Sequence, residues 1–167
     1  EIVVPLREQF RFLERAARET GDRHFGARLG QAVASPHLSA YGAWVCRAET
    51  LHEAMTRAHA GLALMLQTST NLYMAREGER VRWSIEFVEP ETEGRHHNEL
   101  LGIGYMMDVV RVYGGPKWRP HGVATALPRG EPRAELELIL GTNVEHGHAM
   151  PSLTFDASLL ARGHASA

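Results

Sequence analysis

The sequence predicts an α+β fold in which several amphipathic helices pack on a small, mainly antiparallel sheet within a single domain. Helical stripes of apolar residues dominate the chain as far as Leu66. Two alternating segments around Gly78 then predict a β-hairpin, and helices and short strands follow in mixed order. This order differs from the regular strand–helix alternation of a parallel-sheet fold. A length of 167 residues, 44% of them hydrophobic, suffices for one ordinary core.

Two helices are expected at the start of the chain. The first runs from Leu6 to Thr20 and ends at Gly21, because glycine tolerates the left-handed conformation of a helix C-terminus. Its apolar stripe consists of Leu6, Phe10, Leu13 and Ala17. Asp22 is expected to cap a second helix from about Arg23 to Val33. In that helix Gly26 and Gly30 share one face, which would permit a close helix contact.

A break, a short extended segment and a third helix are expected next. Ser35-Pro36-His37 ends the second helix, and the partly β-branched run from Ala40 to Arg47 suits a strand or an extended connection. Thr50 and Glu53 form a capping box at the head of the third helix, which runs to about Leu66. Its apolar residues at helical spacing are Leu51, Ala54, Met55, Ala58 and Leu62.

The second half of the chain mixes strands with helices. The expected hairpin joins Thr70–Ala75 to Val81–Val88. In the second of these strands apolar and polar residues alternate strictly. A long helix from His96 to Tyr113 follows, and its Gly102-x-Gly104 pair is interpreted as a packing feature. The remaining expected elements are a strand at Gly122–Leu127, a helix at Arg133–Leu140 ended by Gly141, strands at Asn143–His146 and Ser152–Phe155, and a helical turn capped by Asp156.

Charge and cysteine content restrict the function classes. The 18 Lys and Arg residues nearly balance 20 Asp and Glu residues, which argues against a chain that itself grips a phosphate backbone. The lone Cys46 forms no internal disulfide, so a reducing cytoplasm is the expected location. The sequence also contains no apolar run of membrane-spanning length.

Ten histidines raise the question of a metal site. His146 and His148 point to one face if they lie on a strand, and His96 and His97 begin a helix with Glu99 nearby. A zinc site needs three or four convergent ligands, and neither His-Glu-x-x-His nor Cys-x-x-Cys spacing occurs. Solvated or hydrogen-bonded histidines are therefore the alternative interpretation, and no metal or cofactor is assigned.

Enzymatic motifs are also missing from the sequence. It contains no Gly-x-Ser-x-Gly, phosphate-loop or dinucleotide-binding pattern. Cys46 lies among apolar neighbours, where desolvation disfavours the reactive thiolate. We therefore expect a protein that is not an enzyme.

An effector pocket requires an apolar cavity with a few polar groups that orient the ligand. The aromatic candidates are Trp44, Tyr73, Trp83 and Trp118. The polar candidates are Arg95 and the His96-His97-Asn98-Glu99 cluster, of which His96 and Glu99 are assigned to the site. Arg95 is the residue expected to pair with a ligand carboxylate. For each aromatic residue the alternative is an ordinary core position, and for each polar residue it is an ordinary surface position.

Four blocks of sequence, in order, resemble one known family. They are Phe12–Asp22 with Phe25–Gly30, Tyr41-Gly42, Glu49–Ala54, and Leu140–His146 with Ser152–Asp156 and Leu159–Arg162. In this order and spacing they resemble the N-terminal ligand-binding and dimerisation domain of AraC-type transcriptional regulators, in the branch that includes regulators of ornithine use and of virulence genes. The closing block departs from the family pattern, because Leu140, Asn143 and His146 replace the common Phe, Pro and Phe.

The resemblance implies a regulatory function. Residues 1–167 would form a sensing domain that binds an unknown small-molecule effector and forms a homodimer. DNA would be bound only through a helix-turn-helix domain that follows this chain in the full-length protein. Two other hypotheses remain open, namely a small metal-dependent hydrolase that uses the histidines and a dimerisation module without a ligand.

Overall fold

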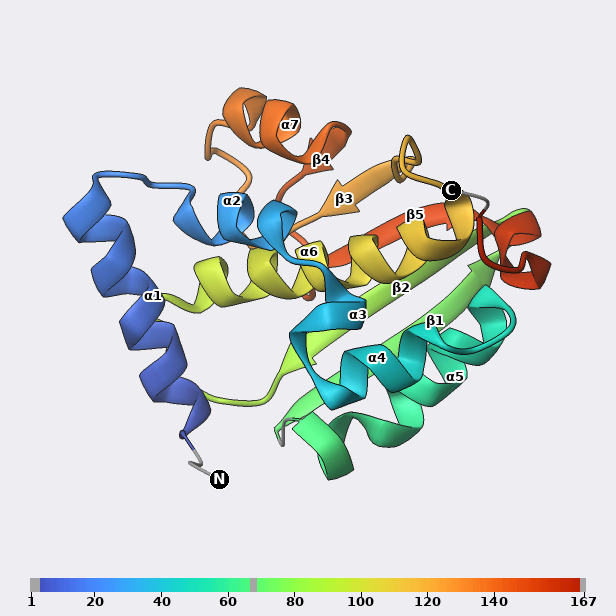
Figure 1. Cartoon of the computed structure of the whole chain (residues 1–167). Coiled ribbons are helices and arrows are strands. Elements are labelled where there is room, and N and C mark those ends of the chain that lie inside the picture. Colours follow the sequence, from blue (N-terminus) through green and yellow to red (C-terminus); the bar gives the residue numbers. More distant parts are fainter. Residues whose placement is uncertain (1–3, 67–68, 166–167) are drawn as a thin grey trace.

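The computed structural model describes residues 4–66 and 69–165, and its elements surround one five-stranded sheet (Figure 1). The helices are α1 (Leu6–Thr20), α2 (Phe25–Ala32), α3 (Ser35–Leu38), α4 (Ala40–Cys46), α5 (Leu51–Gly61), the π-helix η1 (Leu62–Leu66), α6 (Arg95–Gly114), α7 (Ala134–Leu140) and the 3₁₀-helix η2 (Ala157–Ala161). The strands are β1 (Thr70–Glu77), β2 (Arg80–Phe87), β3 (Gly122–Ala124), β4 (Asn143–Glu145) and β5 (Ser152–Asp156). This arrangement confirms the predicted α+β class. No helix in the described ranges is long and apolar enough to cross a membrane.

The sheet has the strand order β1-β2-β5-β3-β4, and only the β3–β4 pair is parallel. The hairpin β1–β2 pairs Thr70 with Phe87 at one end and Glu77 with Arg80 at the other. Gly78 begins its two-residue turn with a φ of 65°, a conformation that glycine adopts without steric cost. The predicted hairpin is therefore confirmed, with strands that reach closer to the turn than expected.

The two faces of β2 differ in the way its alternation predicts. One face buries Val81, Trp83, Ile85 and Phe87 beneath the helices. The opposite face carries Arg82, Ser84 and Glu86, which continue across β5 as Thr154 and Ser152. The core of the molecule consequently lies between one face of the sheet and the helical layer.

Helix α6 is the centre of the helical layer and is buried along most of its length. It crosses α2 at backbone contact distance, because glycines meet on both helices. A Cβ on Gly104 would lie 2.4 Å from the Cα of Gly30, and a Cβ on Gly26 would lie 2.2 Å from the carbonyl oxygen of His97. Gly102 packs on the side chains of Ile85 and Phe87 from the sheet. The packing function predicted for these glycines is confirmed.

Segment 40–47 is helical, so the predicted strand or extended connection there is wrong. Residues Ala40–Cys46 form α4, whose first turn is capped by the Ser39 hydroxyl, 3.0 Å from the Gly42 amide nitrogen. The Tyr41 hydroxyl also donates to the Ala58 carbonyl oxygen of α5 at 2.8 Å. A local cap and packing on α5 thus override the weak β preference of the sequence.

Several element boundaries also differ from those expected. Helix α5 ends at Gly61 and continues to Leu66 as the π-helix η1, and the Asp156 side chain makes no capping hydrogen bond to η2. Helix α2 begins at Phe25, and Asp22 accepts a hydrogen bond from the His24 amide instead of capping the helix itself. Ser35–Leu38 adds one helical turn where only a break was expected. Strand β3 stops at Ala124, because the Thr125 hydroxyl bonds the His146 ring and the Leu127 amide and so turns the chain.

Replacing Gly104 by alanine tests the close helix crossing. Alanine favours a helix interior by about 1 kcal/mol over glycine. At this position its methyl group would collide with the Gly30 backbone, and such overpacking costs about 1–3 kcal/mol or more. We expect Gly104→Ala to lower the melting temperature by roughly 5 °C, measured by circular dichroism.

Gly130→Ala is the matched control, since a Cβ there meets nothing within 4 Å. It should leave the melting temperature nearly unchanged. An unchanged or higher melting temperature for Gly104→Ala would contradict the proposed contact between the two backbones.

Candidate functional site

A cavity of about 830 Å³ lies between the buried face of β1 and β2 and the helices α1, α3, α4 and α6. The π-helix η1 forms part of its wall, and π-helical turns often occur at functional sites. Its volume falls within the range of known small-molecule sites. The cavity is therefore the main candidate for a ligand site.

The lining of this cavity is mostly apolar. The buried part includes Val45, Trp83, Ile85, Phe87, Leu101, Met106 and Val109. The opening is bordered by exposed apolar side chains from three separate segments, namely Val4, Leu38, Leu64 and Met65. An exposed apolar rim around an apolar cavity is unfavourable in water and is typical of a surface that binds another molecule.

A few polar groups also line the cavity. Gln9 of α1 and Asn98 of α6 face each other there, and Gln9 Nε2 donates to Asn98 Oδ1 at 2.5 Å. Tyr105, two turns along α6 from Asn98, also lines the cavity. Burial raises the pKa of Tyr105 above its ordinary value, so its hydroxyl stays protonated at neutral pH. The indole of Trp83 is already used, because its Nε1 donates to His59 Nε2 at 2.9 Å.

The seven sequence-predicted site residues do not gather in one place, and only Trp83 lines the cavity. Trp44 packs against Gly61 and lies under the Arg57 guanidinium. Tyr73 lies on the opposite face of the sheet, where its hydroxyl bonds Glu86. Trp118 packs on Gly114 and Phe155.

Arg95 is held by the protein itself. Its guanidinium donates to the backbone carbonyls of Phe87 and Glu89 and lies 3.4 Å from the carboxylate of Glu99. Burial raises the pKa of Glu99, although the positive charge of Arg95 partly opposes this effect. These contacts give Arg95 a structural use between β2 and α6, away from the cavity lining.

The sequence pattern predicts neither Gln9 nor Tyr105 as a site residue, and it places Asn98 only within the His96-His97-Asn98-Glu99 cluster, without assigning it to the site. A signal for two of them is present on α6, where Asn98 and Tyr105 follow the same helical spacing as the apolar residues Leu101 and Val109. A polar residue in such a stripe faces the interior and needs a partner. Nothing comparable marks Gln9, whose importance depends on where α1 crosses α6.

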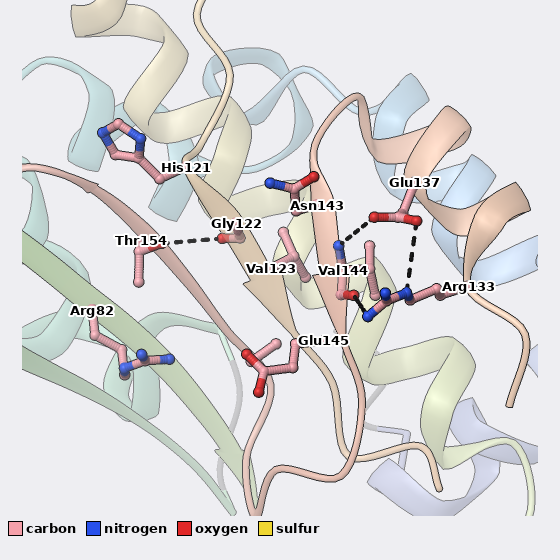
Figure 2. A pocket seen from close by; sticks show the side chains of 11 residues that line it. Arg82, His121, Gly122, Val123, Arg133, Glu137, Asn143, Val144, Glu145 and Thr154 are labelled. Carbon is pink, nitrogen blue, oxygen red and sulfur yellow. Dashed lines mark hydrogen bonds and ion pairs between the residues drawn. The ribbon is translucent and has the colours of Figure 1, made fainter. Parts of the chain in front are cut away.

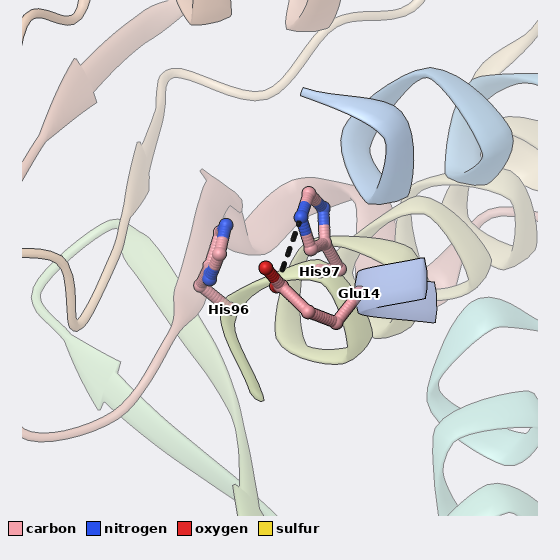
Figure 3. A group of neighbouring side chains, drawn as sticks. All are labelled: Glu14, His96 and His97. Atoms are coloured by element: carbon pink, nitrogen blue, oxygen red, sulfur yellow. Dashed lines mark ion pairs between the residues drawn. The ribbon is translucent and has the colours of Figure 1, made fainter. Parts of the chain in front are cut away.

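His96 and His97 lie beside Glu14 of α1 (Figure 3). The candidate ligand atoms of these three residues lie within 4.8 Å of one another, and in the described part of the chain this is the one group with metal-ligand character. His97 Nδ1 accepts a hydrogen bond from the Gly26 amide at 3.1 Å, so the neutral ring carries its proton on Nε2, facing Glu14. A metal bound at Nε2 would displace the proton to Nδ1, and the hydrogen bond from the Gly26 amide to Nδ1 would then break. The geometry therefore favours a hydrogen-bonded histidine over a metal ligand.

His146 and His148 do not converge on a common site. His146 is buried, with its Nδ1 2.6 Å from the Thr125 hydroxyl, and His148 lies 3.4 Å from Glu145. Cys46 is also buried, and desolvation raises the pKa of its thiol to about 11. The thiol is therefore protonated and unreactive at neutral pH.

A second, smaller cavity of about 480 Å³ lies on the polar face of the sheet (Figure 2). Its cationic groups already have partners: Arg82 bonds Ser152 and Glu77, and Arg133 pairs with Glu137 and the Val144 carbonyl. Because these charges are satisfied and the lining offers little apolar surface, this cleft is the weaker candidate for a ligand site.

Comparison with known proteins identifies the architecture. Residues 1–163 match the family model described as the arabinose-binding domain of AraC transcription regulators, at their N-terminal end. The crystal structure of the transcriptional regulator CdpR from Pseudomonas aeruginosa has a similar fold, with a TM-score of 0.70 at 14% sequence identity. That likeness covers 99% of this chain but only 59% of the CdpR chain. No protein of curated function matches, and the branch of ornithine and virulence regulators stays a prediction.

The buried state of His97 predicts a pH dependence of stability. Burial, assisted by the neighbouring His96, lowers the pKa of His97 from 6.5 to about 4, while Glu14 partly opposes the shift. Between these values the unfolded chain binds more protons than the native one, so stability decreases as the pH falls from about 6.5 towards 4. This residue should contribute a loss of about 3 kcal/mol over that range.

We expect His97→Gln to show a smaller loss of stability on acidification than the wild type, measured by urea unfolding at pH 7 and pH 5. Replacement of the exposed His37 by glutamine controls for the loss of one histidine. Equal pH dependence of the wild type and His97→Gln would show that His97 does not titrate in this way.

Proposed function

This chain belongs to the family of arabinose-binding domains found at the N-terminal end of AraC transcription regulators, and on that premise we propose that its larger cavity binds a small-molecule effector. The observation that carries the proposal is the combination of an apolar cavity with an exposed apolar rim. A ligand seated there would remove both surfaces from water. The family is a regulatory one, so we infer that the domain is a sensor and not an enzyme.

The effector would act by favouring one of two arrangements of the regulator. A ligand shifts such an equilibrium only if it binds one arrangement better than the other. The cavity is formed by segments that are distant in sequence, from Pro5 of the N-terminal region to Val109 of α6. A ligand that contacts several of these segments would therefore stabilise the arrangement in which they pack together.

We propose that residues 1–167 form the sensing and dimerisation part of a longer cytoplasmic regulator. Its homodimer would pass the effector signal to a C-terminal helix-turn-helix domain that binds DNA. The similarity to CdpR is consistent with this organisation, because the matched region is 59% of that regulator's length. A module that dimerises without any ligand is the competing function.

Binding of the uncharged dye Nile red tests whether the cavity accepts an apolar ligand. The dye should fluoresce strongly with the wild-type domain and raise its melting temperature, since a ligand that binds only the native state stabilises it. Leu72→Trp places a bulky ring on a residue that lines the cavity, and we expect it to weaken dye binding roughly 10-fold or more.

Leu138→Trp makes the same replacement on the exposed side of α7 and should leave dye binding unchanged. Absence of dye binding by the wild type would contradict the proposed effector cavity and favour the ligand-free dimerisation module. Equal weakening by both tryptophan variants would show that the dye binds somewhere else.

A further inference from the structure

The lining of the larger cavity defines the chemical class of its ligand. Among the described residues that line it there is no lysine, arginine or histidine, and Glu89 is the one ionisable carboxylate. An anionic ligand in this apolar site would lose its hydration without gaining an opposite charge, which is strongly unfavourable. A cation would meet only Glu89, whose half-exposed carboxylate already accepts a hydrogen bond from the Glu91 amide. Arg95, which precedes Asn98 on the first turn of α6, is paired with Glu99 and bonded to backbone carbonyls.

Hydrogen-bonding capacity remains at the end of the cavity where α1 meets α6. Asn98 is only 2% exposed, yet in the described ranges its side-chain amide makes a single hydrogen bond, the one with Gln9. An asparagine amide offers two donors and an acceptor, so N–H groups and a carbonyl oxygen of this Gln9–Asn98 pair stay available. If both amides are turned over, so that Asn98 donates to Gln9, the pair still has N–H groups and a carbonyl oxygen available.

The Tyr105 hydroxyl adds another donor on the same side of α6. No described residue hydrogen-bonds this hydroxyl, and the side chain lines the cavity. In the described part of the chain, Arg111 Nε is the one fully buried side-chain nitrogen or oxygen without a partner, so the Tyr105 hydroxyl is accessible and free to bind a ligand. The free amide groups and this hydroxyl together are suited to a ligand that presents an uncharged oxygen.

Resting on the proposed effector function, we infer that the ligand is an uncharged, mostly apolar molecule with a hydroxyl or carbonyl oxygen at one end. The oxygen accepts hydrogen bonds from the Gln9–Asn98 pair or Tyr105, and the apolar body lies along the sheet residues and α6. This class excludes ionised carboxylic acids, for which the described lining supplies no positive charge.

Competition against Nile red with three ligands of equal chain length tests this inference. The probes are 1-decanol, decanoate and decylamine, at pH 7.5, where the acid and the amine are ionised. We expect 1-decanol to displace the dye at a concentration about 10-fold or more below that needed for either ion. Burial costs an ion far more hydration energy than it costs a hydroxyl group, which regains hydrogen bonds in the site. Equal or better displacement by decanoate or decylamine would overturn the inference.

Two variants locate the oxygen of the ligand. Asn98→Leu replaces the amide by an apolar group of similar size, and Tyr105→Phe removes only the hydroxyl. We expect at least one of them to weaken 1-decanol binding several-fold, measured by the ligand-induced rise in melting temperature, while the melting temperature of the free protein persists. If both retain full affinity for 1-decanol, the assigned head-group site is wrong. Failure of the wild type to bind Nile red is a separate result, which contradicts the effector cavity itself.

Discussion

The backbone contact between α2 and α6 is the constraint on which the rest of the structure depends. Gly30 and Gly104 let the two helices approach until their backbones touch, so no side chain can lie between them. On another side, Gly102 lets α6 settle on Ile85 and Phe87 of the sheet. With the α2 side fixed, the side of α6 that carries Gly102 faces the sheet and the cavity, together with Asn98, Tyr105 and Val109. The position of the cavity thus depends on the glycines of α6, which set its distance from α2 and the sheet, as well as on the side chains that line the cavity.

The same crossing explains the state of His97. Gly26 belongs to the first turn of α2, whose amide groups lack partners within the helix. His97 supplies one such partner, because the close approach of the helices brings its Nδ1 to the Gly26 amide. Protonation of that nitrogen would remove the acceptor and place a charge between two packed helices, beside His96 and His24. The helix contact therefore has both a steric part and an electrostatic part.

Much of the fold is predictable from local patterns, but the site is not. Helical spacing, the capping box at Thr50 and the turn at Gly78 identify α1, α5 and the hairpin, because each depends on neighbours in sequence. Helix α4 was missed because its packing on α5 outweighs local β preference. Trp83 was found through its strand alternation, whereas Gln9 and Asn98 meet only through the tertiary crossing of α1 and α6. A single sequence contains no signal for that meeting.

The position of Gln9 and Asn98 gives the proposed ligand a direct connection to the N-terminal helix. The Gln9–Asn98 hydrogen bond links α1 to α6 in the cavity wall. Another polar contact between these helices is the pair of Glu14 and His97. An uncharged oxygen bound by this pair would add a partner common to both helices, and it would stabilise the arrangement in which they lie together. An apolar ligand without such an oxygen would fill the cavity without a hydrogen-bonded link between α1 and α6, and so would stabilise that arrangement less. The polar end of the effector would then determine regulation, and its apolar body would determine affinity.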